Sequence, residues 1–324
     1  MKVLDQLPVQ SDPRLLVNTG TFDDAGVIQI DEHTALVQSV DVFPPVVDEP
    51  HAYGAIAAAN ALSDIYAMGA RPLSVLNVLL INRDKLGLDV MAQILQGAAE
   101  VVRESGALGL GGHTVDDAGV VFGLAVTGVV KPGAQVTNSG GQPGDVVYLS
   151  KPIGMGTITT AAKNGKCPDD VLAAAIVSMR TLNKGAAEAM VAAGVHAATD
   201  VTGYGLLGHG HELASGSGVD LHLSASALPV ANGARELMAK GQASGGAART
   251  RAHLGERLVV DAAVPVDLAQ LAADSETSGG LLMAVAPAQA PDLERELAAR
   301  GVLVAAVGRL EARAGAESRL VLEA

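Results

Sequence analysis

The stretch AAANALSDIYAMGARP, residues 57–72, constrains the fold most, because it is an apolar helix that carries a carboxylate. Alanine, isoleucine, leucine and methionine occupy almost every face, yet Asn60 and Asp64 lie one helical turn apart on the same side. Burying an ionised carboxylate is unfavourable unless a cation pairs with it. A fold that buries this helix must therefore bring a positive charge to Asp64.

The neighbouring sequence contains no basic side chain for that purpose. No Lys or Arg occurs between Leu15 and Ala70. The same segment holds these acidic residues: Asp23, Asp24, Asp31, Glu32, Asp41, Asp48, Glu49 and Asp64. Asp31, Glu32, Asp48 and Glu49 lie in polar or turn-like segments where water solvates them, but the helix of Asp64 is apolar almost all round. Mg²⁺, held by carboxylates and by substrate phosphates, is the natural alternative.

Composition narrows the class of protein. The 324 residues suffice for two domains with sizeable cores, and the single cysteine, Cys167, excludes an intrachain disulfide. The formal net charge of −13 argues against a nucleic-acid partner, which requires a basic stripe. The longest apolar run, residues 119–130, is too short to span a bilayer, and a signal peptide is not evident. We expect a soluble cytoplasmic protein that binds neither nucleic acid nor membrane.

Strand-like and helix-like segments alternate in both halves of the chain. β-branched runs predict strands at residues 33–43, 71–81 and 118–130, and amphipathic spacing predicts a helix at 88–106. The Gly- and Pro-rich segment 131–145 is the candidate domain boundary. Beyond it, helical stretches at 168–194 precede strand-like runs at 219–228, 258–264, 280–287 and 302–310. We expect an α+β protein of two α/β lobes, residues 1–140 and 141–324.

Four segments combine glycine or aspartate in patterns that suggest chemistry. They are NTGTFDDAGV (18–27), the helix with Asn60 and Asp64, LGLGGHTVDD (108–117) and ATDVTGYGLLGHG (198–210). Each has an ordinary explanation when taken alone. Paired aspartates often cap their own turn, and a Gly-rich turn presenting His113 and Thr114 is a weak signal. The segment GYGLLGHG lacks the Lys-Ser/Thr ending of a P-loop. Cys167 lies in a polar turn without a nearby His, which favours an incidental thiol over a nucleophile.

Together the segments resemble the selenophosphate synthetase (selenide, water dikinase) family, within the superfamily that includes aminoimidazole ribonucleotide synthetase. The matching strings, in order, are TFDDAGV, SVDVFPPVVDEP, AANALSDIYAMGARP, LGGHTVDD, VFGLAVTGVV, TDVTGYGLLGH and ETSGGLLMAV. The strings TDVTGYGLLGH and GGHTVDD are specific to the family, whereas NALSDIYAMGA and TSGGLL are typical of the superfamily. The resemblance runs from about residue 17 to the C-terminus.

This resemblance implies a fold and a site. It implies two α/β lobes, with a β-barrel of the N-terminal lobe spanning a homodimer, and ATP extended in a cleft with several Mg²⁺ ions on its phosphates. The implied metal ligands are Asp24, Asp64 and Asp200, with Asn60 in a supporting place. The implied nucleotide contacts are Thr21, Phe22, Asp23, Asp41 and Asp64, with Gly112, His113 and Thr114 contributed by the other subunit.

The N-terminus departs from the family pattern. Family members carry a Gly-rich stretch with a reactive Cys or selenocysteine and then a Lys, whereas this sequence starts with MKVLDQLPVQSDPRLLV, which resembles the segment after that stretch. Lys2 lies too close to the start to match that Lys, and Cys167 lies in the other domain. We therefore expect no catalytic residue of this kind in the chain, through truncation, a misplaced start or a form without the loop.

The leading hypothesis is an enzyme that makes selenophosphate from ATP and selenide, releasing AMP and phosphate. One alternative is another ATP-dependent ligase of the superfamily, against which TDVTGYGLLGH counts. The other is an ATP-binding regulatory partner or impaired form, suggested by the absent loop. On that basis the chain as written is expected to bind Mg-ATP and to make little or no selenophosphate.

Overall fold

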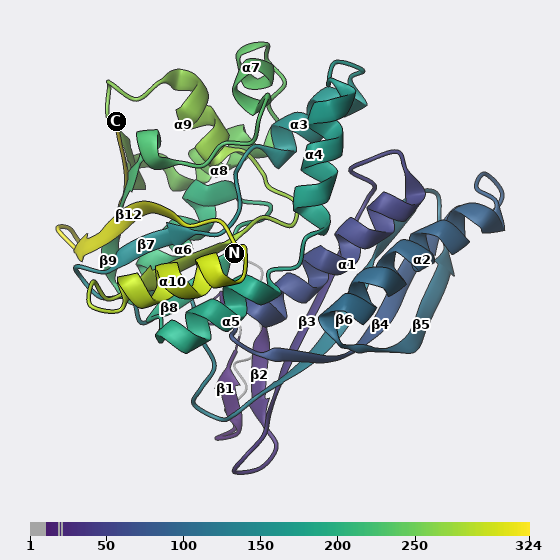
Figure 1. Cartoon of the computed structure of the whole chain (residues 1–324), viewed down its shortest axis with the longest axis horizontal. Coiled ribbons are helices and arrows are strands. Elements are labelled where there is room, and N and C mark those ends of the chain that lie inside the picture. Colours follow the sequence, from purple (N-terminus) through teal and green to yellow (C-terminus); the bar gives the residue numbers. More distant parts are fainter. Residues whose placement is uncertain (1–10, 19, 21) are drawn as a thin grey trace.

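The first lobe is a six-stranded sheet with two helices on one face (Figure 1). The computed structural model describes residues 11–18, 20 and 22–324. In spatial order the strands are β1 (Leu15–Val17), β2 (Gly26–Gln29), β3 (Ala35–Phe43), β6 (Val120–Val130), β4 (Arg71–Ile81) and β5 (Leu108–Asp116). Neighbouring strands run antiparallel except β4 and β5, which run parallel. The helices are α1 (Pro50–Ala67) and α2 (Leu88–Ser105).

Helix α1 is the buried helix that the sequence predicts. Glu49 caps its N-terminus by accepting hydrogen bonds from the backbone N–H groups of His51 and Ala52, and Gly69, with φ of 64°, follows its end. The helix packs on β3 and β6 and also against helices and a strand of the second lobe. Because neighbours surround it, an all-round apolar sequence is stable there.

Helices α1 and α2 touch backbone to backbone. A Cβ atom added at Gly54 would lie 1.9 Å from the carbonyl oxygen of Ile94, and one added at Gly97 would lie 1.9 Å from that of His51. Only glycine permits this approach, so the position of α1 over the sheet leaves little freedom.

The other face of the first sheet exposes apolar side chains. Val40 on β3 is 64% exposed, and Leu76 on β4 is 45% exposed. Both residues pair with Ala125 of β6, so they lie in one row across the sheet. Further exposed apolar residues lie on β3, β4 and β5: Val42, Leu73, Leu108, Leu110 and Val115.

The second lobe is a seven-stranded sheet with helices packed around it. In spatial order the strands are β10 (Leu258–Val260), β13 (Leu320–Glu323), β9 (Val219–Ser224), β12 (Ala305–Ala312), β7 (Val146–Leu149), β11 (Leu281–Val285) and β8 (Ala197–Asp200). Its helices are α3 (Met155–Lys163), α4 (Asp169–Arg180), α5 (Lys184–Ala193), α6 (Gly205–Ser217), α7 (Ala234–Ala239), α8 (Gly245–Leu254), α9 (Val266–Ala273) and α10 (Ala290–Ala299). Strand β13 runs parallel to both of its neighbours, β10 and β9.

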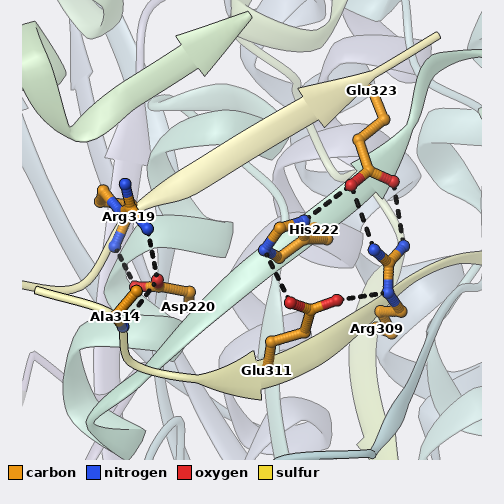
Figure 2. Close-up of polar contacts among 7 residues, drawn as sticks. All are labelled: Asp220, His222, Arg309, Glu311, Ala314, Arg319 and Glu323. Carbon is orange, nitrogen blue, oxygen red and sulfur yellow. Dashed lines mark hydrogen bonds and ion pairs between the residues drawn. The ribbon is translucent and has the colours of Figure 1, made fainter. Parts of the chain in front are cut away.

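A polar cluster joins three neighbouring strands of this sheet. Figure 2 shows His222 of β9 between two carboxylates, with Nδ1 2.8 Å from Glu323 Oε1 and Nε2 3.4 Å from Glu311 Oε2. Arg309 of β12 contacts the same two carboxylates, at 2.7 Å for Glu311 and 2.9 Å for Glu323. The cluster therefore fixes β13 to β9 and β12 through side chains as well as backbone.

The main strands and helices of the first half agree with the sequence prediction. Two mixed β-sheets, each packed with helices, agree with the predicted α+β class. The two sheets occupy residues 15–130 and 146–323, and a domain boundary at residue 140 stays an interpretation. Within the described residues, the helices are all too short or too polar to cross a membrane.

The prediction of a Gly-rich turn at residues 108–117 is wrong, because this segment is strand β5. It pairs with β4, with Val78 opposite His113 and Leu79 opposite Thr114. The register shifts near Asn77, where a Cβ atom at Gly112 would lie 2.0 Å from the Asn77 carbonyl oxygen. The glycine therefore permits a close strand contact at an irregularity and does not form a chain reversal.

Candidate active site

Four aspartates from both lobes gather where the lobes meet. Asp24 precedes β2, Asp41 lies on β3, Asp64 lies on α1, and Asp200 ends β8. The negative charge of Asp200 acts on the other three carboxyl groups. The structure thus brings together the three predicted metal ligands, of which Asp64 is also a predicted nucleotide contact, and a further predicted nucleotide contact, Asp41.

The segment before β2 is held by the second lobe and by the linker. The Thr199 hydroxyl of β8 donates to Asp24 Oδ1 at 2.9 Å. The backbone N–H of Asn138 donates to Asp23 Oδ1 at 2.7 Å, and the Asn138 side chain donates to the Phe22 carbonyl at 2.9 Å. Phe22 is left-handed, with φ of 53°, and its side chain is exposed. This segment is therefore shaped by distant contacts.

Asn60 and Asp64 both face the site, as their helical spacing predicts. Ser39 of β3 donates to Asp64 Oδ2, and Asn60 Nδ2 donates to Asp41 Oδ2. The Asn60 side-chain carbonyl accepts a 2.9 Å hydrogen bond from the backbone N–H of Ser278. Asn60 therefore links β3 of the first lobe to the turn before β11 of the second.

The protein environment disfavours negative charge on these carboxyl groups. Burial raises the pKa values of Asp24 and Asp64 well above the ordinary range, and the charge of Asp200 raises them further. Burial and Asp200 also raise the pKa of Asp41. Burial raises the pKa of Asp200 as well, although the charge on His209 opposes this. A bound cation would relieve the repulsion among all four groups.

The aspartates suit a magnesium ion. Asp24 Oδ2 and Asp200 Oδ2 are buried and have no hydrogen-bond partner among the described residues, so each retains an acceptor oxygen. Across the described part of the chain, no three His, Cys, Asp or Glu side chains are already arranged as a metal cage. Mg²⁺ usually takes one or two carboxylates and completes its shell with water and substrate phosphates. The aspartates present therefore fit this metal better than one that requires a closed cage.

Two residues that the sequence analysis did not select lie at this site. Lys151 follows β7 and is buried, and burial lowers its pKa to about 7 while the charge of Asp200 acts in the opposite direction. His209 of α6 is also buried, with Nε2 3.2 Å from the Thr202 hydroxyl and Nδ1 3.2 Å from Glu212 Oε2. The sequence signal for Lys151 is a lysine two residues after an apolar strand, in VVYLSKPIG.

Other predicted residues lie elsewhere. Gly112, His113 and Thr114 are exposed on β5, which is the edge strand beyond β4, whereas Asp41 lies on β3 beyond β6. Within one chain they do not join the aspartates. Thr21 lies outside the described residues, as does Lys2.

Cys167 lies in the second lobe, just before α4. Its Sγ donates weakly to the Pro168 carbonyl at 3.4 Å. Burial raises the pKa of the thiol, which disfavours the nucleophilic thiolate. This environment agrees with an incidental thiol.

Comparison with known proteins identifies the family. The AIR synthase related protein family matches with its N-terminal domain over residues 22–130 and with its C-terminal domain over residues 142–321. A selenide, water dikinase of Porphyromonas gingivalis is 43% identical over 301 residues, which cover 93% of this chain and 86% of that protein. The chain belongs to the selenide, water dikinase family. A second member, from Carboxydothermus hydrogenoformans, is 44% identical over 315 residues, covering 97% of this chain and 91% of the other.

A solved structure outside the family has the same fold. The thiamine-monophosphate kinase of Stenotrophomonas maltophilia superposes with a TM-score of 0.71 at 21% identity, covering 96% of this chain and 92% of that one. The predicted family is therefore confirmed, and the α+β fold is that of the AIR synthase-like superfamily.

Proposed function

We propose that this chain is an ATP-dependent selenide, water dikinase that converts ATP, selenide and water to selenophosphate, AMP and phosphate. The observation that carries this proposal is identity of 43–44% to selenide, water dikinases over more than nine-tenths of the chain. The same similarity favours the synthetase over a different ligase or a regulatory partner.

In this proposal the aspartates organise the nucleotide phosphates. Asp24, Asp64 and Asp200 hold several Mg²⁺ ions, which when bound neutralise phosphate charge. Thr199 and Ser39 orient the first two carboxylates through their hydroxyl groups. Nucleotide contacts are proposed for the remaining predicted residues of this lobe: Thr21, Phe22, Asp23 and Asp41.

We further propose that the protein works as a homodimer. The row of Val40, Ala125 and Leu76 gives the open face of the first sheet an apolar surface of the kind that soluble proteins bury. Two such faces related by a two-fold axis would form a shared barrel. In that arrangement β5 of one subunit would bring Gly112, His113 and Thr114 toward the nucleotide of the other.

Phosphorus NMR of the protein with ATP, Mg²⁺ and selenide tests the reaction. The sequence alone predicts little or no selenophosphate. Because identity to selenide, water dikinases spans more than nine-tenths of the chain, we instead expect a selenophosphate signal together with AMP and phosphate, all dependent on selenide. ATP binding without AMP formation would point to a regulatory partner. Formation of ADP and phosphate whether or not selenide is present would contradict the proposed reaction.

A further inference from the structure

Lys151 occupies an unusual position for a lysine. The residue is 7% exposed, and its ammonium lies between two backbone carbonyl groups. Nζ donates to the Thr181 carbonyl at 2.6 Å and to the Ser278 carbonyl at 2.9 Å. The first carbonyl belongs to the segment between α4 and α5, and the second to the turn before β11. One side chain therefore holds two separate segments together, and the second of them leads into Leu281, which pairs with Asp200.

The turn at residues 278–280 is tightly constrained. Ser278 adopts a left-handed backbone, with φ of 50°, which is strained for a residue that has a side chain. A Cβ atom at Gly279 would lie 2.1 Å from the Val201 carbonyl oxygen, and one at Gly280 would lie 2.4 Å from the Lys151 backbone nitrogen. Such a turn persists only because its surroundings hold it in place.

A neutral side chain, that of Asn183, holds the same turn at the next residue, Gly279. Asn183 Nδ2 donates to the Gly279 carbonyl at 2.8 Å and to the Ser63 hydroxyl of α1 at 2.8 Å. Hydrogen bonds to carbonyl groups therefore do not require a charged donor at this turn. Burying an ammonium group is unfavourable without an anion, and the charge of Asp200 acts on Lys151.

We propose that Lys151 is a positioning residue for the metal and phosphate site: its ammonium fixes the 278–280 turn, which leads into Leu281, the strand partner of Asp200, and places there a positive charge that offsets Asp200. The residue acts through Asp200 and the turn. This role rests on the proposed function only in that the site binds Mg-ATP. It also explains how the acidic site has a cation although residues 15–70 contain none.

The test separates the donor from the charge. K151Q keeps hydrogen-bond donors and removes the charge, K151M removes both, and K163Q at an exposed lysine of α3 is the matched control. Titration calorimetry should show Mg-ATP affinity about tenfold weaker in K151Q, the scale of one charge-assisted hydrogen bond. K151M should be weaker still, and K163Q should equal the wild type. Wild-type affinity in K151Q would overturn the proposal.

A double-mutant cycle on unfolding needs no nucleotide. If the charges balance, K151Q lowers the thermal midpoint in the wild-type background and lowers it less in D200N. Equal shifts in both backgrounds would indicate a merely structural lysine and overturn the proposal. Should K151Q alone fail to fold, K151Q/D200N lacks both charges and is expected to fold, and an unfolded double variant would contradict the pairing. Because these readouts do not involve selenide, failure of the proposed reaction is seen separately, by phosphorus NMR.

Discussion

At the scale of single residues, Asp64 lies on a helix without a local base, and its partners come from elsewhere. Ser39 donates to its carboxylate, and the charges of Asp200 and Asp24 act on it. A carboxylate placed among other carboxylates lowers the stability of the unliganded protein and raises its affinity for a cation. Ligand binding is therefore the property that these residues are expected to serve.

Asp64→Asn and Asp200→Asn should each abolish most Mg-ATP binding while leaving the fold intact. Asp64→Asn removes a carboxylate from a repulsive group, so this metal-free variant should be no less stable than the wild type. Asp200→Asn also removes the charge that offsets Lys151, so this variant should be somewhat less stable. Calorimetry with Mg-ATP measures affinity, and circular dichroism checks the fold. An ordinary surface substitution changes free energy by only about 0.5 kcal/mol, so wild-type affinity in both variants would refute the assignment.

The sequence predicted the site residues that carry recognisable strings and missed those defined only by packing. Asn60 and Asp64 were predicted to face one point because helical spacing is a local property. Lys151 was missed because it lies far along the chain from residues 15–70, and only the folded lobe places it where the charge of Asp200 acts on it. The ammonium partners are the backbone carbonyls of Thr181 and Ser278, and because every residue has a carbonyl, the residue type does not reveal them.

At the scale of elements, helix α3 begins on a buried carboxylate. Glu276 accepts hydrogen bonds from the backbone N–H groups of Gly154, at 2.6 Å, and Met155, at 2.9 Å. The residue is 4% exposed, and burial raises its pKa from 4.5 to about 8. Between these values the folded protein holds a proton that the unfolded chain releases, so stability falls as pH rises through this range.

Glu276→Gln should flatten this dependence. Wild-type free energy of unfolding should decrease between pH 5 and pH 8, since each tenfold difference in proton affinity between the folded and unfolded states corresponds to ~1.4 kcal/mol. The glutamine variant lacks the titrating group, so its urea unfolding curves should move less over the same range. The exposed Glu256→Gln serves as the control and should retain the wild-type slope. A wild-type slope in Glu276→Gln would show that other groups cause it.

The cluster on β9, β12 and β13 should stabilise the second sheet in neutral solution. Hydrogen bonds from Arg309, and then from His222, lower the pKa of Glu323 to about 2. This contribution is present above the ordinary value of 4.5 and is lost as pH falls toward 2.

Glu323→Gln should therefore lower the free energy of unfolding by about 1 kcal/mol at pH 7, a small value because the side chain is 36% exposed. Urea unfolding in low salt measures the difference, which should shrink toward zero near pH 2. Glu317→Gln, at an exposed position outside the cluster, should match the wild type throughout. A difference that persists at the acidic end would exclude the ion pairs as its source.

Helices and strands were predicted best where the local sequence alone determines them. The β-branched run at 71–81 became β4 with the predicted bounds, and the amphipathic segment 88–106 became α2 (Leu88–Ser105). Residues 258–264 became a strand of only three residues, β10, which ends where an aspartate turn begins. Strand β5 was missed because glycine suggests a turn locally, while pairing with β4 is decided across the sheet.

At the scale of the whole molecule, the open face of the first sheet predicts the assembly. Leu76→Asp places a charge in the exposed apolar row and should convert a dimer to a folded monomer. Leu88→Asp, at the exposed start of α2, is the matched control and should leave the dimer unchanged. Analytical ultracentrifugation measures both. A wild-type protein that is monomeric in dilute solution and still binds Mg-ATP tightly would contradict the shared site.

The place of β13 between β9 and β10 has a consequence for biosynthesis. A ribosome delivers β9 and β10 before β13, the strand that joins them. Until then the nascent second sheet carries two unpaired edges, which are sites for association with other chains. The first sheet, by contrast, has all its strands by Val130. A chain truncated before Leu320 would therefore have a first sheet with all its strands and a second sheet with unpaired strand edges. Those edges would make it prone to association and a substrate for chaperones.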